Sequence, residues 1–207
     1  MWIKICGITT PEAIEAAVAA GVDAVGFVLA PSPRQLSPVQ AARLAQPVRG
    51  RLCCVAVTRH PTQELLDEVL AELHPDLWQS DLEDMSALRT PRGLARLPVL
   101  RPGRALPEPL PARVLYEGPV SGAGVACDWS AAQPIARRTE LVLAGGLTAA
   151  TVPAAIASVR PFGVDVSSGV EEQPGKKSAQ KILEFAQAAR GAFAARPGGR
   201  GSKEYRR

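Results

Sequence analysis

The first unit of the chain begins Trp2-Ile3-Lys4-Ile5-Cys6-Gly7-Ile8-Thr9-Thr10-Pro11. Trp2–Ile5 is a short apolar run that predicts a strand, and Thr10-Pro11 places a capping residue before a proline at the first position of a helix. A second apolar run, Ala24–Val28, follows the expected helix. A doubly wound sheet calls for a glycine-rich turn after its first strand, and this turn has only Gly7. The segment therefore favours a (β/α)8 barrel.

Strand-like and helix-like runs alternate along the rest of the chain. The expected strands are Trp2–Ile5, Ala24–Val28, Leu52–Val57, Leu77–Gln79, Pro98–Leu100, Val114–Tyr116, Leu141–Ala144 and Phe162–Val166. The expected helices are Pro11–Ala20, Pro38–Ala45, Pro61–Leu73, Leu82–Leu94, Ser130–Arg137, Ala149–Val159 and Lys176–Ala194. Eight short strands that are apolar on both faces are typical of a buried parallel sheet, and 207 residues lie near the lower limit for an eight-stranded barrel. Arg101–Pro111 contains four prolines, which predicts a loop in place of the fifth helix.

The charge of the chain is concentrated at its C-terminal end. The formal net charge is +4, and residues 196–207 contain five basic residues against one acidic residue, so residues 1–195 are close to neutral. We expect a single barrel domain over residues 1–195 and a disordered basic tail over 196–207. A basic tail can contact RNA, but one that only aids solubility is the preferred interpretation, so no nucleic-acid partner is predicted.

Composition excludes several other classes of protein. No apolar run is long enough to span a bilayer, and the N-terminus has no signal-peptide pattern, so neither a membrane nor a secreted location is expected. The four cysteines (Cys6, Cys53, Cys54 and Cys127) have no metal-ligand spacing. We predict a cytoplasmic protein with no disulfides and no metal site.

Lys4 and Cys6 form the first candidate for reactive chemistry. Side chains alternate along a strand, so these two share a face, and Cys6 lies where the strand ends. A nearby cation favours the thiolate, which is the reactive form of cysteine. The alternative is that Cys6 is a small buried side chain and Lys4 a surface charge.

In a barrel of this class, catalytic and binding groups follow the C-terminal ends of the strands. Glu117 follows the sixth strand, alternates with Leu115 and should therefore point inward, where it could act as an acid opposite Cys6. The Ser121-Gly122-Ala123-Gly124 loop comes next. Arg34, after the second strand, could bind a substrate carboxylate through two parallel hydrogen bonds, or it could be a surface arginine.

Two glycine-containing loops predict a phosphate site. Gly145-Gly146 follows the seventh strand, and Ser167-Ser168-Gly169 follows the eighth and could open a short extra helix. Glycines allow a ligand to approach backbone N–H groups closely, and the loops after strands seven and eight form the usual phosphate site of this fold. Each loop alone could be an ordinary turn, but their joint position favours Gly145, Gly146, Ser168 and Gly169 as phosphate-binding residues.

These segments together resemble the phosphoribosylanthranilate isomerase family. The matching blocks are Lys4–Thr9, Asp23–Val28, Ser32-Pro33-Arg34, Leu143–Leu147, Gly163–Glu171 and Pro174-Gly175-Lys176-Lys177. They run in order through nearly the whole chain except the tail.

The resemblance implies a cofactor-free isomerisation of N-(5-phosphoribosyl)anthranilate in tryptophan biosynthesis. It implies Cys6 as the general base, and it carries the acid role of the family's aspartate to Glu117. It also implies that Arg34 holds the anthranilate carboxylate and that Asp165 and Lys4 lie near the substrate. Three stretches depart from the family pattern: Leu115-Tyr116-Glu117 stands for Leu-Leu-Asp, Trp78-Gln79-Ser80-Asp81-Leu82 stands for Val-Gln-Leu-His-Gly, and Ser121-Gly122-Ala123-Gly124 stands for Gly-Gly-Thr-Gly.

Two other functions stay open from the sequence. One is a related phosphosugar isomerase or epimerase barrel, such as the histidine-pathway isomerase. Members of that family have an aspartate at the position of Cys6, so the thiol argues against this alternative. The other is a catalytically decayed barrel that only binds a phosphorylated ligand. In each case the expected partner is a small phosphorylated molecule, and the protein is expected to be a monomer or a homodimer.

Overall fold

The computed structural model describes residues 1–118 and 128–196 and has a closed barrel of eight parallel strands at its centre. The strands are β1 (Trp2–Cys6), β2 (Ala24–Val28), β3 (Cys53–Val57), β4 (Leu77–Asp81), β5 (Ala95–Leu100), β6 (Arg113–Tyr116), β7 (Glu140–Leu143) and β8 (Gly163–Val166). They follow each other around the barrel in chain order, and β1 closes it by pairing with both β2 and β8. The predicted barrel is confirmed.

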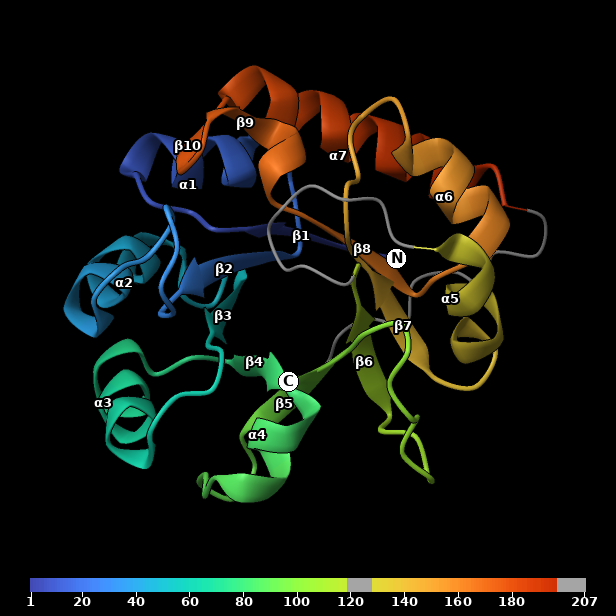
Figure 1. The fold of residues 1–207 in the computed structure, drawn as a ribbon. Helices are drawn as coiled ribbons and strands as arrows, with labels where there is room; N and C mark the ends of the chain where they lie inside the picture. The colour runs from blue at the N-terminus through green and yellow to red at the C-terminus, as the bar shows by residue number, and fades with distance from the viewer. Residues whose placement is uncertain (119–127, 197–207) are drawn as a thin grey trace.

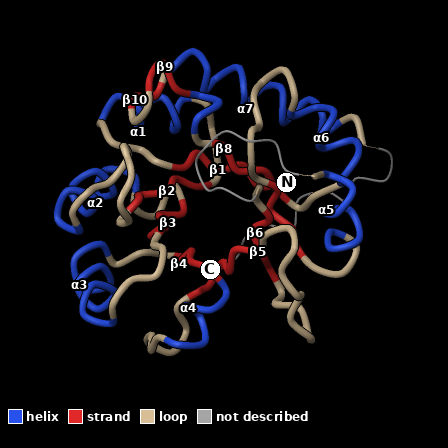
Figure 2. The backbone as a smooth tube through the Cα atoms, in the orientation of Figure 1, coloured by secondary structure: helices blue, strands red, loops and turns tan. Residues whose placement is uncertain are grey.

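Helices surround the ring of strands (Figures 1 and 2). They are α1 (Pro11–Ala19), α2 (Pro38–Ala45), α3 (Gln63–Leu73), α4 (Leu82–Ala87), α5 (Trp129–Ala136), α6 (Val152–Val159) and α7 (Ala179–Ala194). Thr10 and Ser37 cap α1 and α2 with their side-chain oxygens, and a proline follows each cap at the start of the helix, as predicted. Asp128 caps α5 by accepting a hydrogen bond from the Ser130 backbone N–H.

Three predicted helix starts and one predicted helix end are wrong. The helix expected from Ala149 begins at Val152, because residues 149–151 form a turn. The helix expected to reach Leu94 ends at Ala87, because Leu88 has an extended backbone.

Pro61 was expected to begin the third helix, but α3 begins at Gln63. Thr62 is its N-cap, because the Thr62 hydroxyl accepts a hydrogen bond from the Leu65 backbone N–H. Lys176 and Lys177 are not helical: they form the short strand β10 (Lys176–Lys177), which pairs antiparallel with β9 (Glu171–Gln173). Ser178 then caps α7, so that helix starts later than the sequence pattern indicated.

Strand alternation divides the core into two layers. Residues such as Val55, Leu97 and Leu115 point into the barrel, while residues such as Ile5, Val25 and Leu143 pack against the surrounding helices. The adjacent Cys53 and Cys54 fall on opposite sides of this division, as their positions in one strand predict. The interior of the barrel is therefore a packed core beneath the C-terminal ends of the strands.

The connections differ in ways that bear on function. Arg101–Ala112, between β5 and β6, contains turns and bends but no helix, as its prolines predicted. After β8 come a short 3-10 helix, η2 (Ser168–Val170), and the β9–β10 ribbon. Arg196, where the basic tail was expected to begin, donates hydrogen bonds to the carbonyls of Pro161 and Arg160, and residues 197–207 lie outside the described part of the chain. Within the described residues, no helix has both the length and the hydropathy of a membrane-spanning segment.

Candidate active site

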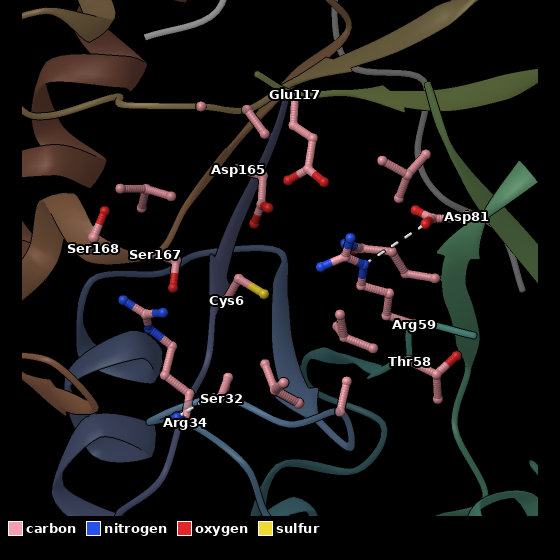
Figure 3. Close-up of a pocket in the computed structure, with 18 of the residues that line it drawn as sticks. Cys6, Ser32, Arg34, Thr58, Arg59, Asp81, Glu117, Asp165, Ser167 and Ser168 are labelled. Carbon is pink, nitrogen blue, oxygen red and sulfur yellow. Dashed lines mark hydrogen bonds and ion pairs between the residues drawn. The ribbon is translucent and has the colours of Figure 1, made fainter. Parts of the chain in front are cut away.

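A cavity of about 170 Å³ opens at the C-terminal ends of the strands (Figure 3). It is lined by eight of the nine residues predicted to form the site: Cys6, Arg34, Glu117, Gly145, Gly146, Asp165, Ser168 and Gly169. Lys4 is the exception, since it is fully buried and lies outside the cavity lining. The rule that functional groups follow the C-terminal ends of the strands, here called the strand-end rule, therefore identified residues that lie together in one cavity.

Lys4 lies beneath Cys6 inside the barrel. Both side chains pack against Gly26 of the neighbouring strand, where a Cβ would lie only 3.0 Å from Lys4 Cε and 3.1 Å from Cys6 Sγ. Lys4 Nζ donates to Asp165 Oδ1 at 3.0 Å, and these two residues are paired in the register of β1 and β8. The glycine on β2 thus makes room for a buried ion pair directly under the thiol.

The net effect of this environment on Cys6 differs from the expectation. Burial raises the pKa of the Cys6 thiol above its ordinary value of 9.0; Lys4 and Lys177 act in the opposite direction, but they do not outweigh it. Burial alone would lower the pKa of Lys4, yet Asp165 and Cys6 raise it to about 12, so the ammonium stays charged. Lys4 therefore favours the Cys6 thiolate, as expected, but the burial of the thiol outweighs this effect and the pKa of Cys6 stays raised.

This environment predicts how Cys6 reacts with an alkylating agent. Because the thiolate is the nucleophile, the rate of Cys6 carboxamidomethylation by iodoacetamide should rise about tenfold for each pH unit from 6 to 9. Peptide mass spectrometry measures the rate at Cys6, and a Cys6→Ala variant gives the background from the other cysteines. A rate that stays constant across this range would mean that the thiolate is already formed at pH 6.

Glu117 forms part of a charged wall on the side of the cavity made by β4, β5 and β6. Arg101 donates from Nη2 to Glu117 Oε1 at 2.6 Å and from Nη1 to Asp81 Oδ1. In Figure 3 the Glu117 carboxyl and the Cys6 thiol point into the same pocket. Asp81 lies across the pocket from Cys6, and its Oδ2 is 4.0 Å from Arg59 Nε. Glu117 thus faces the cavity, as its alternation with Leu115 predicted.

Arg34 does make the parallel pair of hydrogen bonds expected of it, but its partner is a carboxylate of the protein. Its Nε and Nη2 donate to the two oxygens of Glu171 at 2.7 and 2.8 Å. The side chain is buried against Gly7 and also lines the cavity, so the alternative of a surface arginine is wrong.

The two loops predicted to bind phosphate are packed against each other. A Cβ at Gly169 would lie 1.9 Å from the Leu147 carbonyl oxygen, so only glycine permits this approach. Gly145 and Gly146 both have positive φ, at 91° and 64°. Ser168 opens η2, which is the predicted short extra helix. The loops after β7 and β8 therefore form one continuous wall of glycine backbone and hydroxyl groups.

Sequence reasoning missed several residues of the opposite wall. Thr58, Gln79, Asp81 and Arg101 line the cavity from the ends of β3, β4 and β5. Ending the fourth strand at Gln79 hid Asp81, although the same strand-end rule would have found it. The Ser121-Gly122-Ala123-Gly124 loop lies outside the described residues. Among the residues that are described, no cluster of His, Cys, Asp and Glu side chains is suited to hold a metal ion.

Comparison with known proteins places the chain in a family. The family model for N-(5'-phosphoribosyl)anthranilate isomerase matches residues 3–99 and 103–188. A curated relative from Rhizobium etli, named N-(5'-phosphoribosyl)anthranilate isomerase, is 37% identical over 93% of this chain and 95% of its own length. The crystal structure of the isomerase from Thermus thermophilus superposes with a TM-score of 0.79 at 30% identity, covering 92% of this chain and 99% of that one.

A further solved structure has a ligand. It is phosphoribosyl anthranilate isomerase in complex with reduced 1-(o-carboxyphenylamino)-1-deoxyribulose 5-phosphate, with a TM-score of 0.74 and 31% identity over 92% of this chain and 99% of that one. The family model covers the barrel from β1 into α7, including every predicted site residue. This chain belongs to the N-(5'-phosphoribosyl)anthranilate isomerase family.

Proposed function

We propose that this protein converts N-(5-phosphoribosyl)anthranilate to 1-(2-carboxyphenylamino)-1-deoxyribulose 5-phosphate in tryptophan biosynthesis. The observation that carries the proposal is the set of residues that line one cavity. Cys6 and Glu117 line it together with the glycine wall formed by the loops after β7 and β8. An acid, a base and backbone N–H groups that can bind a phosphate are the groups that this reaction needs.

Glu117 starts the reaction as the general acid. Its carboxyl protonates the ring oxygen of the ribose, and the bond between that oxygen and C1′ breaks as the nitrogen lone pair forms a C1′=N bond. Arg101 holds the carboxyl at 2.6 Å and fixes its direction. The product of this step is an open-chain iminium ion.

Cys6 completes the reaction as the general base. The thiolate removes the proton from C2′, and the electrons of that C–H bond form a C1′=C2′ double bond while the C1′=N electrons return to nitrogen. The resulting enolamine tautomerises to the C2′ ketone. C1′ is reduced and C2′ is oxidised within one molecule, so the reaction is an intramolecular oxidoreduction that needs no cofactor.

The remaining groups orient the substrate. The phosphate would bind to the backbone N–H groups and the hydroxyl of Gly145, Gly146, Ser168 and Gly169. The anthranilate carboxylate would lie against Arg34, and Asp165, which already accepts from Lys4, would contact the amine or a hydroxyl group. We further infer that the enzyme acts in the cytoplasm, as a monomer or homodimer, without a nucleic-acid partner.

Growth of a bacterial strain that lacks this isomerase tests the function. The gene for this protein should restore growth without tryptophan, and the Cys6→Ala variant, expressed to the same level, should not. Failure of the folded wild-type protein to restore growth would contradict the proposal. Growth restored instead in a strain that lacks the histidine-pathway isomerase would favour the related barrel enzyme.

Gln79 offers a prediction that separates binding from stability. Its Oε1 is buried and has no hydrogen-bond partner among the described residues, although the side chain lines the cavity. A buried polar group without a partner destabilises the free protein, and a ligand can supply the partner. Gln79→Leu should therefore raise the free energy of unfolding in urea by about 1 kcal/mol and lower kcat/KM by about tenfold.

Gln180→Leu, on the exposed face of α7, is the control for this change. It should alter neither kcat/KM nor the free energy of unfolding by more than about 0.5 kcal/mol. A Gln79→Leu enzyme with full kcat/KM would exclude Gln79 from substrate binding.

A further inference from the structure

Three buried charged side chains meet beside the cavity. Two of them, Glu171 and Lys177, have no role in the reaction steps proposed above. Arg34, Glu171 and Lys177, here called the Glu171 cluster, come from the loop after β2 and from strands β9 and β10. Glu171 accepts from Arg34 at 2.7 and 2.8 Å and from Lys177 Nζ at 2.8 Å. The Glu171 and Lys177 side chains are 5% and 0% exposed, so both are removed from solvent.

The cluster ties Arg34 to the wall of the proposed phosphate site. Lys177 Nζ donates not only to Glu171 but also to the Ser167 carbonyl at 3.0 Å and to Ser167 Oγ at 3.3 Å. In Figure 3 the Arg34 guanidinium lies on the Ser167 side of the pocket, close to Cys6. Arg34 and the loop after β8 therefore share one anchor.

The β9–β10 ribbon that carries Glu171 and Lys177 is itself held in place. Thr9 Oγ1, in the loop after β1, donates to the Gly175 carbonyl at 2.6 Å. A Cβ at Gly175 would lie 2.5 Å from the Pro33 carbonyl oxygen, so the ribbon packs tightly against the residue that precedes Arg34. The ribbon thus fixes both the side chain and the backbone around Arg34.

The charges of the cluster do not cancel. One carboxylate faces two cations, which leaves a surplus of one positive charge beside the cavity. Burial alone would raise the pKa of Glu171, yet the hydrogen bonds from Arg34 and Lys177 bring it below its ordinary value, so the carboxylate stays ionised. Burial lowers the pKa of Lys177, although Glu171 acts against this.

Arg34 also keeps one nitrogen outside the cluster. Glu171 uses its Nε and Nη2, and Nη1 has no protein partner within residues 1–118 and 128–196. A guanidinium held on one edge by a carboxylate is fixed in plane, so its remaining N–H groups have a set direction. Such a group can bind an anion with little loss of side-chain entropy.

We infer that Glu171 and Lys177 are positioning residues that orient Arg34 toward the aryl carboxylate of the substrate, and so set the preference for a 2-carboxyphenyl group over a phenyl group. This inference rests on the proposed function, because it takes the carboxylate to bind at Arg34. The two residues act through Arg34 and do not touch the reacting atoms.

Two stable ligands test the inference by calorimetry. One is reduced 1-(2-carboxyphenylamino)-1-deoxyribulose 5-phosphate, and the other is its phenylamino counterpart, which has the same phosphate and chain but no carboxyl. The wild-type protein should bind the first about 10- to 100-fold more tightly, as expected for one charge-assisted contact to a carboxylate. The measured quantity is the ratio of the two Kd values.

The variants remove the anchor of Arg34 but leave Arg34 itself. Glu171→Gln should bring the Kd ratio close to one and leave the Kd of the phenyl ligand within about threefold of the wild-type value. The double variant Glu171→Gln/Lys177→Met keeps the same surplus charge as the wild type, since it removes one carboxylate and one ammonium. It should also lose the preference, because position rather than net charge is the cause.

Glu172→Gln and Lys176→Met are matched controls. Each lies next to a cluster residue on the same ribbon, but the two form an exposed ion pair at 3.1 Å. Both should keep the wild-type Kd ratio. Lys177→Arg, which retains the charge and can donate to Glu171, should recover part of the preference relative to Lys177→Met.

The outcomes separate this inference from the proposed function. A wild-type protein that binds neither ligand would contradict the proposed function. A wild-type preference that survives in the folded double variant would overturn the inference alone. If a cluster variant weakens the binding of both ligands equally, the cluster only stabilises the fold and the inference fails. The inference also fails if thermal unfolding shows that both cluster variants are unfolded and Lys177→Arg does not recover the preference for the carboxylated ligand.

Discussion

Replacing Cys6 with alanine is expected to lower kcat by at least ~10²-fold, the usual loss for a positioned general base. The thiol lines the cavity at the end of β1, and no other described residue of the cavity lining is a cysteine or a histidine. Water can replace the base only inefficiently because it is neither held at C2′ nor as basic as a thiolate. Steady-state kinetics on N-(5-phosphoribosyl)anthranilate measures the loss, and KM should change by less than kcat.

Cys53→Ala is the matched control for this change. Cys53 is the first residue of β3 and faces the barrel interior at the opposite end of the strands, away from the cavity. This variant should keep kcat within about threefold if it folds, since Cys53 touches none of the proposed site. A folded Cys6→Ala enzyme with wild-type kcat would show that the thiol is not the base.

Replacing Glu117 with glutamine should also lower kcat by at least ~10²-fold, because the amide keeps the shape of the side chain but has no acidic proton to give to the ring oxygen. Arg101 would still meet an oxygen of the new side chain, so the geometry of the wall should largely survive. The expected loss is therefore chemical, and it should be seen in kcat rather than in KM.

Glu140→Gln provides the comparison for Glu117→Gln. Glu140 begins β7 and also accepts a hydrogen bond from an arginine, Arg113, but it is half exposed and lies at the other end of the barrel. Its replacement should leave kcat unchanged. Equal activity of the two variants would remove the acid role from Glu117, and Asp81, the other carboxylate bound to Arg101, would be the next residue to replace.

The barrel was predictable because its signals are local. Apolar runs, prolines at helix starts and the proline-rich Arg101–Pro111 segment each act over a few residues, and the strand-end rule then collected Cys6, Glu117 and the glycine loops at one end. Lys176 and Lys177 were mispredicted as helix although a local signal was present. Their strand pairs with β9 across the Pro174-Gly175 turn, and that signal was outweighed by the helical pattern of the residues that follow.

The electrostatics of the site could not be predicted from the sequence. The partner of Arg34 is Glu171, which lies 137 residues away, and no spacing rule connects them. The shared contact of Asp81 and Glu117 with Arg101 likewise joins three strands. The state of Cys6 depends on a balance: the sequence showed the cation Lys4, whereas the burial that outweighs it and the Asp165 carboxylate that engages it appear only in the fold.

The catalytic activity itself can be measured by following the fluorescence of N-(5-phosphoribosyl)anthranilate in the presence of the purified protein. The wild type is expected to consume the substrate in many turnovers and to form the open-chain ketone, while folded Cys6→Ala and Glu117→Gln each do so at least ~10²-fold more slowly. If the substrate decays only at its spontaneous rate in the presence of the folded wild-type protein, the protein is not this isomerase.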